Sequence, residues 1–287
     1  MYLQVLMNAL ITGSIYAAIA FGFTLIYGTM NFFNMAYGSN VLVGAYLYYV
    51  FYSLCGIPIP ASIILACALS AALMLLVDRL CYYRFRHRRV PGWTAVSVSM
   101  AVAPFFSALV SIIFGSAKVT VYRAIPKSLV LFSGVRITTI QLTSLLTTVV
   151  LMGAMSLFLK KTKTGKKIRA ISDDKTMAAV VGIDVEKVYG AIIAASSILA
   201  AAAGIMSAMD TDLRPTIASS SLLKAIVATS IGGAGNIRGA LIAAFVLGLA
   251  ENVAVLYVGS GWRDAIPLVL VILALVIKPS VFGLEES

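Results

Sequence analysis

Long apolar runs separated by short polar breaks follow one another along almost the whole of this chain. A helix that crosses a membrane needs about 20 mostly apolar residues, and no charged side chain occurs before Asp78. The pattern predicts helices over these apolar segments: 3–27, 35–53, 59–80, 93–114, 137–159, 188–209, 222–231, 239–258 and 265–277.

The seventh segment is too short to cross a membrane on its own. The glycine-rich sequence GGAGNIRG follows it, so we interpret 222–231 as a half-span joined to a re-entrant loop. The count is therefore about eight or nine transmembrane helices, with a Gly-rich break near the C-terminal third. We predict an all-α, polytopic membrane bundle in which residues 1–287 form a single domain.

Composition agrees with a membrane protein. Hydrophobic residues make up 61% of the chain and charged residues 11%, whereas a soluble domain usually has about 25% charged residues. The N-terminal run MYLQVLMNALITG has no Lys or Arg, which argues against a cleaved signal peptide. The three cysteines show no metal or redox spacing, so we expect free thiols packed as small hydrophobic groups.

Basic residues predict the orientation of the spans. Arginines cluster within 79–89 and eight Lys or Arg lie within 160–187; two predicted spans separate these groups. They should therefore share a side, and the positive-inside rule makes that side the cytoplasm. The opposite loop also carries Lys118, Arg123, Lys127 and Arg136, which weakens this asymmetry without reversing it. Anionic lipid explains the net charge of +11 better than a nucleic-acid partner does.

The cytoplasmic segment 160–187 concentrates charge in a chain that is otherwise sparing of it. Ser172 is predicted to cap a short helix, with Asp173 and Asp174 at the positive end of its dipole. Gly182 is the predicted stop. Met177, Val180 and Val181 should lie on one face of this helix. That apolar face needs a cover, which is either the inner ends of the spans or a soluble partner.

A cluster of amides and small residues interrupts the apolar N-terminal third. A helix would put Asn31, Asn34 and Gly38 on one face, with Ser39 and Asn40 beside them. Two readings remain open, namely ordinary packing between helices and a broken helix that lines a translocation path. Glu251 is an acidic residue well inside an apolar run, and either a functional or a hydrogen-bonded structural role fits it.

Enzyme and nucleotide-binding readings find no support in the motifs. The chain lacks the phosphate-binding sequence G-x-x-x-x-G-K-[ST], and GGAGNIRG has neither a preceding strand nor a following Lys-Ser or Lys-Thr. A single histidine, His87, lies among arginines and leaves most acid-base and metal schemes without the groups they need. We expect a non-enzymatic chain that binds no cofactor or metal of its own.

Three stretches carry a family resemblance that covers nearly the whole chain. They are NALITGSIYAAIAFGFTLIYGTMNFFNMAYGSNVLVGAY, TGKKIRAISDDKTMAAVVGIDVEKV and LLKAIVATSIGGAGNIRGALIAAFVLGLAE. Together they resemble the membrane subunits of bacterial ABC importers for branched-chain amino acids. The resemblance implies a permease that forms half of a translocation path in the cytoplasmic membrane, for branched-chain or other hydrophobic amino acids.

The resemblance also implies partners. These are cytoplasmic ATPase subunits that bind ATP and Mg, a second permease subunit that is a copy or a paralogue, and an extracytoplasmic solute-binding protein. Related permeases for urea, short amides or another small polar solute have similar motifs, so the cargo stays open. An ATPase-independent channel or secondary transporter is the alternative of a different class.

The resemblance, taken together with the predicted topology and the charges above, points to three groups of residues. ATPase coupling falls to Ser172, Asp173, Asp174, Met177, Ala178, Ala179, Val181 and Gly182. The translocation path would include Asn31, Asn34, Gly38, Ser39, Asn40 and Glu251, although Ser39 stands where the family has a glutamate. Binding-protein docking on the outer side is expected at Arg123, Lys127 and Arg214.

Overall fold

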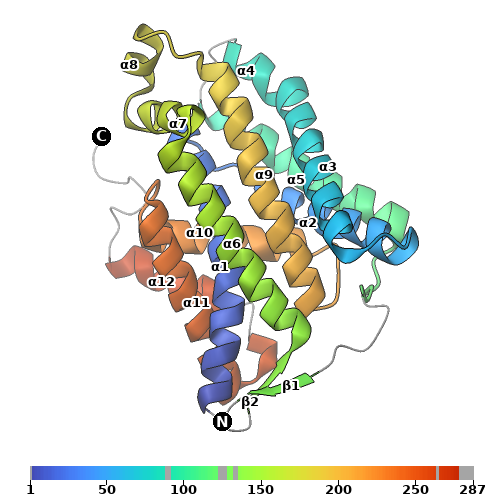
Figure 1. Cartoon of the computed structure of the whole chain (residues 1–287). Coiled ribbons are helices and arrows are strands. Elements are labelled where there is room, and N and C mark those ends of the chain that lie inside the picture. Colours follow the sequence, from blue (N-terminus) through green and yellow to red (C-terminus); the bar gives the residue numbers. More distant parts are fainter. Residues whose placement is uncertain (1, 88–91, 122–127, 132–134, 263–264, 278–287) are drawn as a thin grey trace.

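A computed structural model describes residues 2–87, 92–121, 128–131, 135–262 and 265–277 (Figure 1). Its helices are α1 (Tyr2–Met30), α2 (Tyr37–Tyr49), α3 (Ile59–Val77), α4 (Tyr83–His87), α5 (Gly92–Phe114), α6 (Thr139–Lys161), α7 (Lys163–Asp173), α8 (Lys175–Val180), α9 (Val185–Asp210), α10 (Ile217–Gly232), α11 (Ile237–Val258) and α12 (Ala265–Ile277). Short π-helical turns η1 (Val50–Leu54) and η2 (Asp78–Tyr82) continue α2 and α3, and a 3₁₀ turn η4 (Ser260–Trp262) follows α11.

The all-α polytopic bundle is confirmed, and each of the nine predicted apolar segments is mainly helical. Within the described residues, six helices are long and apolar enough to cross a membrane. The helices α2, α10 and α12 are shorter, with 13, 16 and 13 residues. The length expectation for the seventh segment needs correction, because α10 begins at Ile217 rather than at residue 222.

The loop before α6 contains a feature that the apolar pattern did not predict. Strands β1 (Ser128–Leu131) and β2 (Val135–Thr138) form an antiparallel hairpin in which Ser128 pairs with Thr138. The predicted fifth span therefore begins at Thr139 and not at 137. Thr138 ends the strand and caps α6, since its hydroxyl accepts from the Gln141 backbone N–H and the Gln141 side chain accepts in return.

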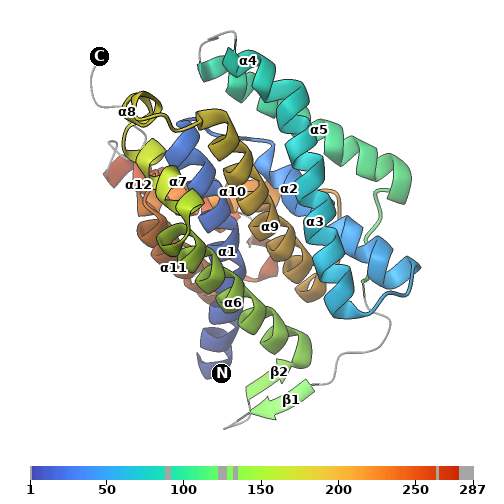
Figure 2. The same ribbon diagram turned by 45° about the horizontal axis from the view of Figure 1, so that its top comes forward.

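The core lies around α1 and α9. In the most apolar stretch of each helix, 94% of the residues of α1 and 78% of those of α9 are buried, against 17% for α5 and α6. The helices α5 and α6 therefore present most of their apolar surface outward, as lipid-facing helices do. Figure 2 shows α1 and α9 inside the bundle, with α3, α5 and α6 toward its outside.

Small residues let the central helices approach backbone to backbone. A Cβ added to Gly44 of α2 would lie 2.4 Å from the Ala201 Cα of α9, and one added to Gly204 would lie 2.1 Å from the Val41 carbonyl oxygen. Membrane helices commonly associate through such small residues, because lipid leaves no hydrophobic driving force between them. The contact fixes α2 against α9.

The two ends of the bundle carry different features (Figure 1). The helices α4, α7 and α8 lie at one end, which we call the α8 end, and the β1–β2 hairpin lies at the other, the hairpin end. The basic clusters 79–89 and 160–187 meet at the α8 end, because Arg86 contacts Glu186. The described residues of both clusters therefore lie at the same end of the bundle, as predicted, and the side of the membrane that this end faces stays a prediction.

Candidate functional site

The segment 160–187 folds as two short helices in series, α7 and α8. The predicted cap is wrong by two residues: Ser172 and Asp173 belong to the last turn of α7, and Asp174 caps α8. Its Oδ1 accepts from the backbone N–H groups of Thr176 at 2.7 Å and Met177 at 3.0 Å. Ser172 cannot cap α8, because the longer basic helix α7 continues through it to Asp173.

The helix α8 exposes an apolar face, as its sequence predicts. Met177 is 64% exposed, Val180 77% and Val181 81%. Ala178 faces inward and is buried, while Ala179 is exposed. Gly182 ends the segment at a φ of +87°, a left-handed conformation that glycine adopts without strain. Contiguous exposed apolar surface of this kind often marks a site of protein–protein contact.

The start of α9 is fixed close to α8. Asp184 caps α9 by accepting from the Lys187 backbone N–H, and its other oxygen lies 3.0 Å from the Lys187 Nζ. These hydrogen bonds hold the pKa of the exposed Asp184 below its ordinary value. The Lys175 Nζ lies 5.3 Å from the ring centre of Tyr189, so a cation–π contact connects α8 with α9.

Arg86 connects this region to the third span. Its Nη1 and Nη2 donate to the two oxygens of Asp78 at 2.6 and 2.9 Å, and Nη2 also donates to Glu186 at 2.9 Å. The Asp78 side chain is only 8% exposed and that of Arg86 18%. Because a buried charge needs a partner, the arginine and both carboxylates form one structural unit that joins η2, α4 and α9.

The N-terminal amide cluster lies at a break between helices. Asn31 has a φ of +55°, and 31–36 is not helical, so the expectation of one helical face through Asn31, Asn34 and Gly38 is wrong. The Asn34 Oδ1 accepts from the Ala36 backbone N–H at 3.0 Å and from the Tyr82 hydroxyl at 3.3 Å. Such local side-chain bonds compete with helix formation.

The residues after the break are packed in the interior. A Cβ added to Gly38 would lie 2.2 Å from the Ala218 carbonyl oxygen of α10. Ser39 and Asn40 are buried, and the Asn40 Oδ1 accepts from the Ser70 hydroxyl at 2.6 Å. A cavity of about 20 Å³ lies between Asn34 and Asn40, room for one water molecule. Close packing thus accounts for these residues in this conformation, and their role in a path stays a prediction.

Glu251 of α11 is fully buried and faces a lysine. Its Oε1 lies 3.4 Å from the Lys224 Nζ of α10, and the same ammonium group donates to the Tyr16 hydroxyl of α1 at 2.6 Å. Asn252, the partner that the sequence suggested, instead donates to the Gly248 carbonyl. The interpretation of the sequence missed Lys224, although a single charged residue in an otherwise uncharged apolar run is a visible signal.

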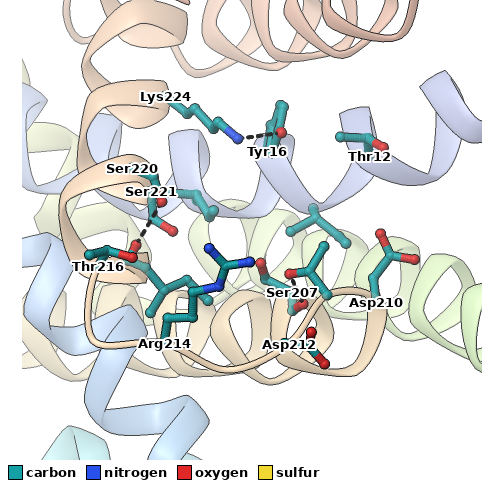
Figure 3. A pocket seen from close by; sticks show the side chains of 14 residues that line it. Thr12, Tyr16, Ser207, Asp210, Asp212, Arg214, Thr216, Ser220, Ser221 and Lys224 are labelled. Carbon is teal, nitrogen blue, oxygen red and sulfur yellow. Dashed lines mark hydrogen bonds between the residues drawn. The ribbon is translucent and has the colours of Figure 1, made fainter. Parts of the chain in front are cut away.

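A cavity of about 230 Å³ opens between α1, the end of α9 and the start of α10 (Figure 3). We call it the outer cavity. It lies toward the hairpin end, because the segment after α9 pairs there with Val119 through Leu213. Its polar lining includes Tyr16, Asp210, Asp212, Arg214, Ser220 and Lys224. A second cavity of about 300 Å³ shares Thr216, Ser220 and Lys224 with it and extends to α12.

The docking residues expected on the outer side are only partly described. Arg123 and Lys127 lie outside the described residues. Arg214 is exposed and lines the outer cavity, where Figure 3 shows its guanidinium turned into the space below Tyr16. The structure therefore brings Arg214 together with α1 and α10, which the sequence did not indicate.

Comparisons with known proteins agree with this architecture. Residues 5–275 match the family model described as the permease component of branched-chain amino acid transport systems. The chain is 27% identical to the Escherichia coli K12 protein named high-affinity branched-chain amino acid transport system permease protein LivH, over 97% of this chain and 94% of that one. It is 28% identical to the Pseudomonas aeruginosa permease protein BraD, with the same shares covered.

A solved structure shares the fold. The chain from the complex titled PsaBC from Streptococcus pneumoniae in complex with Fab aligns with a TM-score of 0.52 at 14% identity. The alignment covers 97% of this chain and 93% of that one. The arrangement of helices is therefore one that a chain of known structure also adopts.

Proposed function

This chain belongs to the family of permease components of branched-chain amino acid transport systems, and from that premise we propose that it forms half of the translocation path of an ATP-driven importer. The cargo is a branched-chain or other hydrophobic amino acid. The α8 end faces the cytoplasm and the hairpin end faces outward. The membrane is the bacterial cytoplasmic membrane.

The exposed apolar face of α8 is the observation that carries this proposal. Met177, Val180 and Val181 are each more than 60% exposed, at 64, 77 and 81%, at the end of the molecule that gathers the basic clusters. A soluble ATPase subunit that receives this face in a groove would bury it. Ala178 faces the core of this chain, so Met177, Ala179 and Val181 are the expected contacts and Asp174 fixes the helix that presents them.

The partners follow from the same premise. ATP and Mg bind to the cytoplasmic subunits, a second permease chain completes the path, and an extracytoplasmic binding protein delivers the solute to the hairpin end. Lys118 and Arg214 are exposed there and offer positive charge to acidic residues of such a protein. Electrostatic complementarity of this kind would set the rate of association and its orientation.

Purification of the tagged chain from cells that make it naturally, followed by reconstitution, tests the proposal. We expect an ATPase and a second permease to co-purify, and radiolabelled leucine to enter proteoliposomes only with ATP and binding protein. A matched preparation whose ATPase cannot hydrolyse ATP should show no uptake. Uptake by the chain alone, without ATPase subunits, would identify a channel or secondary transporter instead. Uptake of urea or a short amide in place of leucine would show that the transporter carries a small polar solute and not a hydrophobic amino acid.

A further inference from the structure

We propose that the outer cavity binds the zwitterionic head group of the transported amino acid, with Arg214 contacting its carboxylate and Asp210 its ammonium group. The proposal rests on the proposed function, since it names the site at which this permease receives its cargo. It reassigns Arg214 from a surface that docks a protein to a residue that contacts the solute.

The charges of the outer cavity are the first argument. Arg214 and Lys224 carry two positive charges, and Asp210 and Asp212 carry two negative charges. Lys224 already contacts Glu251 and Tyr16 at the inner side of the cavity, which leaves Arg214 as the cation nearest the rim. Asp212 accepts a hydrogen bond from the Thr120 hydroxyl, which does not line the cavity. Arg214 and Asp210 are therefore the two charges that face a solute, and a solute with one charge of each sign matches them, whereas a simple cation or anion would leave one of them uncompensated.

The positions of Arg214 and Asp210, the two residues proposed to contact the head group, are the second argument. Asp210 ends α9, and Arg214 stands in the segment that leads to α10. Figure 3 shows the Arg214 guanidinium in the space below Tyr16 and the Asp210 carboxylate farther along α1, below Thr12, while Asp212 points away from α1. The Gln141 side chain donates to Asp210 Oδ1 at 3.1 Å and fixes that carboxylate. Arg214 can bind a carboxylate with two parallel N–H groups.

The remaining lining favours a small solute with an apolar side chain. Ile15, Ile19 and Ile217 border the cavity and are otherwise buried. Its volume of about 230 Å³ is below the roughly 300 Å³ at which pockets for drug-sized ligands begin. Polar groups at the rim and isoleucines on the wall correspond to the head group and the side chain of a hydrophobic amino acid.

Protection of an engineered cysteine measures occupancy directly. Cys55, Cys67 and Cys81 are first replaced, and Ser220→Cys then supplies one thiol on the cavity wall. The assembled transporter is placed in nanodiscs without binding protein, and the rate of modification by a small methanethiosulfonate reagent is measured. Leucine at about 10 mM should slow the reaction severalfold, because a site with even a millimolar dissociation constant would then be mostly full.

Analogues assign the two head-group contacts. Leucinamide lacks the carboxylate charge and 4-methylpentanoate lacks the ammonium group, so neither should protect Ser220→Cys at the same concentration. Arg214→Gln should raise the leucine concentration needed for protection by about tenfold or more, as expected when a charged hydrogen bond is lost. Arg214→Lys should recover part of this loss. Thermal unfolding of the variants shows whether the fold is intact, which we expect because Arg214 is exposed.

Two controls stand at the hairpin end outside the cavity. Gly261→Cys on η4 is exposed with open space around it, and leucine should not change its modification rate. Lys118→Gln removes an exposed positive charge and should leave the protection of Ser220→Cys unaltered.

Several results would overturn the proposal. Absence of protection by leucine, equal protection by leucinamide, or protection that appears only when binding protein is added would each show that the cavity does not hold the head group. If leucine uptake persists in that case, the proposed function stands and the site is wrong. If the transporter imports no amino acid while Ser220→Cys is still protected by leucine, the site stands and the proposed transport function is wrong.

Discussion

Arg86 binds Asp78 through two hydrogen bonds, from Nη1 to Oδ1 at 2.6 Å and from Nη2 to Oδ2 at 2.9 Å. The two residues lie eight positions apart, where α3 passes through a π-helical turn into α4. Arg86 also reaches Glu186 at the start of α9. One guanidinium therefore joins the third span to the helix that follows the coupling segment.

Removal of this arginine should destabilise the α8 end. Arg86→Ala leaves the buried Asp78 carboxylate without its cation, and such changes cost about 3 to 5 kcal/mol. We expect a clear fall in the thermal unfolding midpoint of the detergent-purified subunit. The double variant Arg86→Ala, Asp78→Ala should be less destabilised than Arg86→Ala alone, because the most deeply buried carboxylate of the unit is then absent and only the more exposed Glu186 has lost its cation.

The control for this experiment is the exposed pair between Lys187 and Asp184, whose side chains are 86% and 50% exposed. Exposed ion pairs contribute about 0 to 1 kcal/mol, so Lys187→Ala should leave the unfolding midpoint nearly unchanged. Equal effects of Lys187→Ala and Arg86→Ala would contradict the structural role given to Arg86.

A charge on the exposed face of α8 should separate ATP hydrolysis from transport. Val181→Glu adds a carboxylate where the wild-type side chain is 81% exposed, so the subunit should fold and insert normally. In the assembled transporter the charge would be buried against the ATPase, and co-purification or transport-coupled hydrolysis should fall sharply. Ala178→Asp is the matched variant on the inner face, and it should reduce the amount of folded subunit itself. If transport stays fully coupled to ATP hydrolysis in Val181→Glu, then α8 does not form the contact with the ATPase.

Gly38 and Gly153 should respond in opposite ways to the same substitution. A methyl group at Gly38 meets the Ala218 carbonyl oxygen at 2.2 Å, so Gly38→Ala should push α2 away from α10 and lower the unfolding temperature. Gly153 of α6 has nothing within 4 Å, and alanine there should be neutral or stabilise the helix by up to about 1 kcal/mol. Thermal unfolding of both variants distinguishes them, and a neutral Gly38→Ala would show that α2 and α10 are less tightly packed than described.

Cysteine labelling should distinguish the two ends of the bundle. Lys163 of α7 and Lys118 after α5 are both exposed. A membrane-impermeant maleimide should label Lys118→Cys in intact cells or spheroplasts and Lys163→Cys only after the membrane is opened. Labelling of both positions from the same side would contradict the orientation proposed for the α8 end.

The sequence predicted the helices well because apolar length is a local property. The short α10 could be predicted from an apolar segment that ends at the glycine-rich sequence GGAGNIRG, and the cluster of amides around Asn34 marked the place where the helix is interrupted. The position of the coupling-helix cap was harder, since Ser172 and Asp174 both suit an N-terminus and only the extent of α7 decides between them.

The outer cavity could not be predicted from local patterns. Tyr16 and Lys224 are 208 positions apart and meet only because α1 and α10 pack together. Likewise the structure, and not the spacing of residues, brings Arg214 to the same cavity as α1. Helix packing depends on small residues such as Gly38, whose partner across the interface a single sequence does not identify.

The close contact between α2 and α9 has a mechanical consequence. Where Gly44 meets Ala201 and Gly204 meets Val41, no layer of side chains separates the two backbones, so the pair has little freedom to slide or repack. The helix α9 has 26 residues, or about 39 Å at 1.5 Å per residue, and extends from beside α8 to Asp210. Because α2 packs closely against it, we expect α9 to move as a rigid body, so that a tilt at one end also displaces the other end.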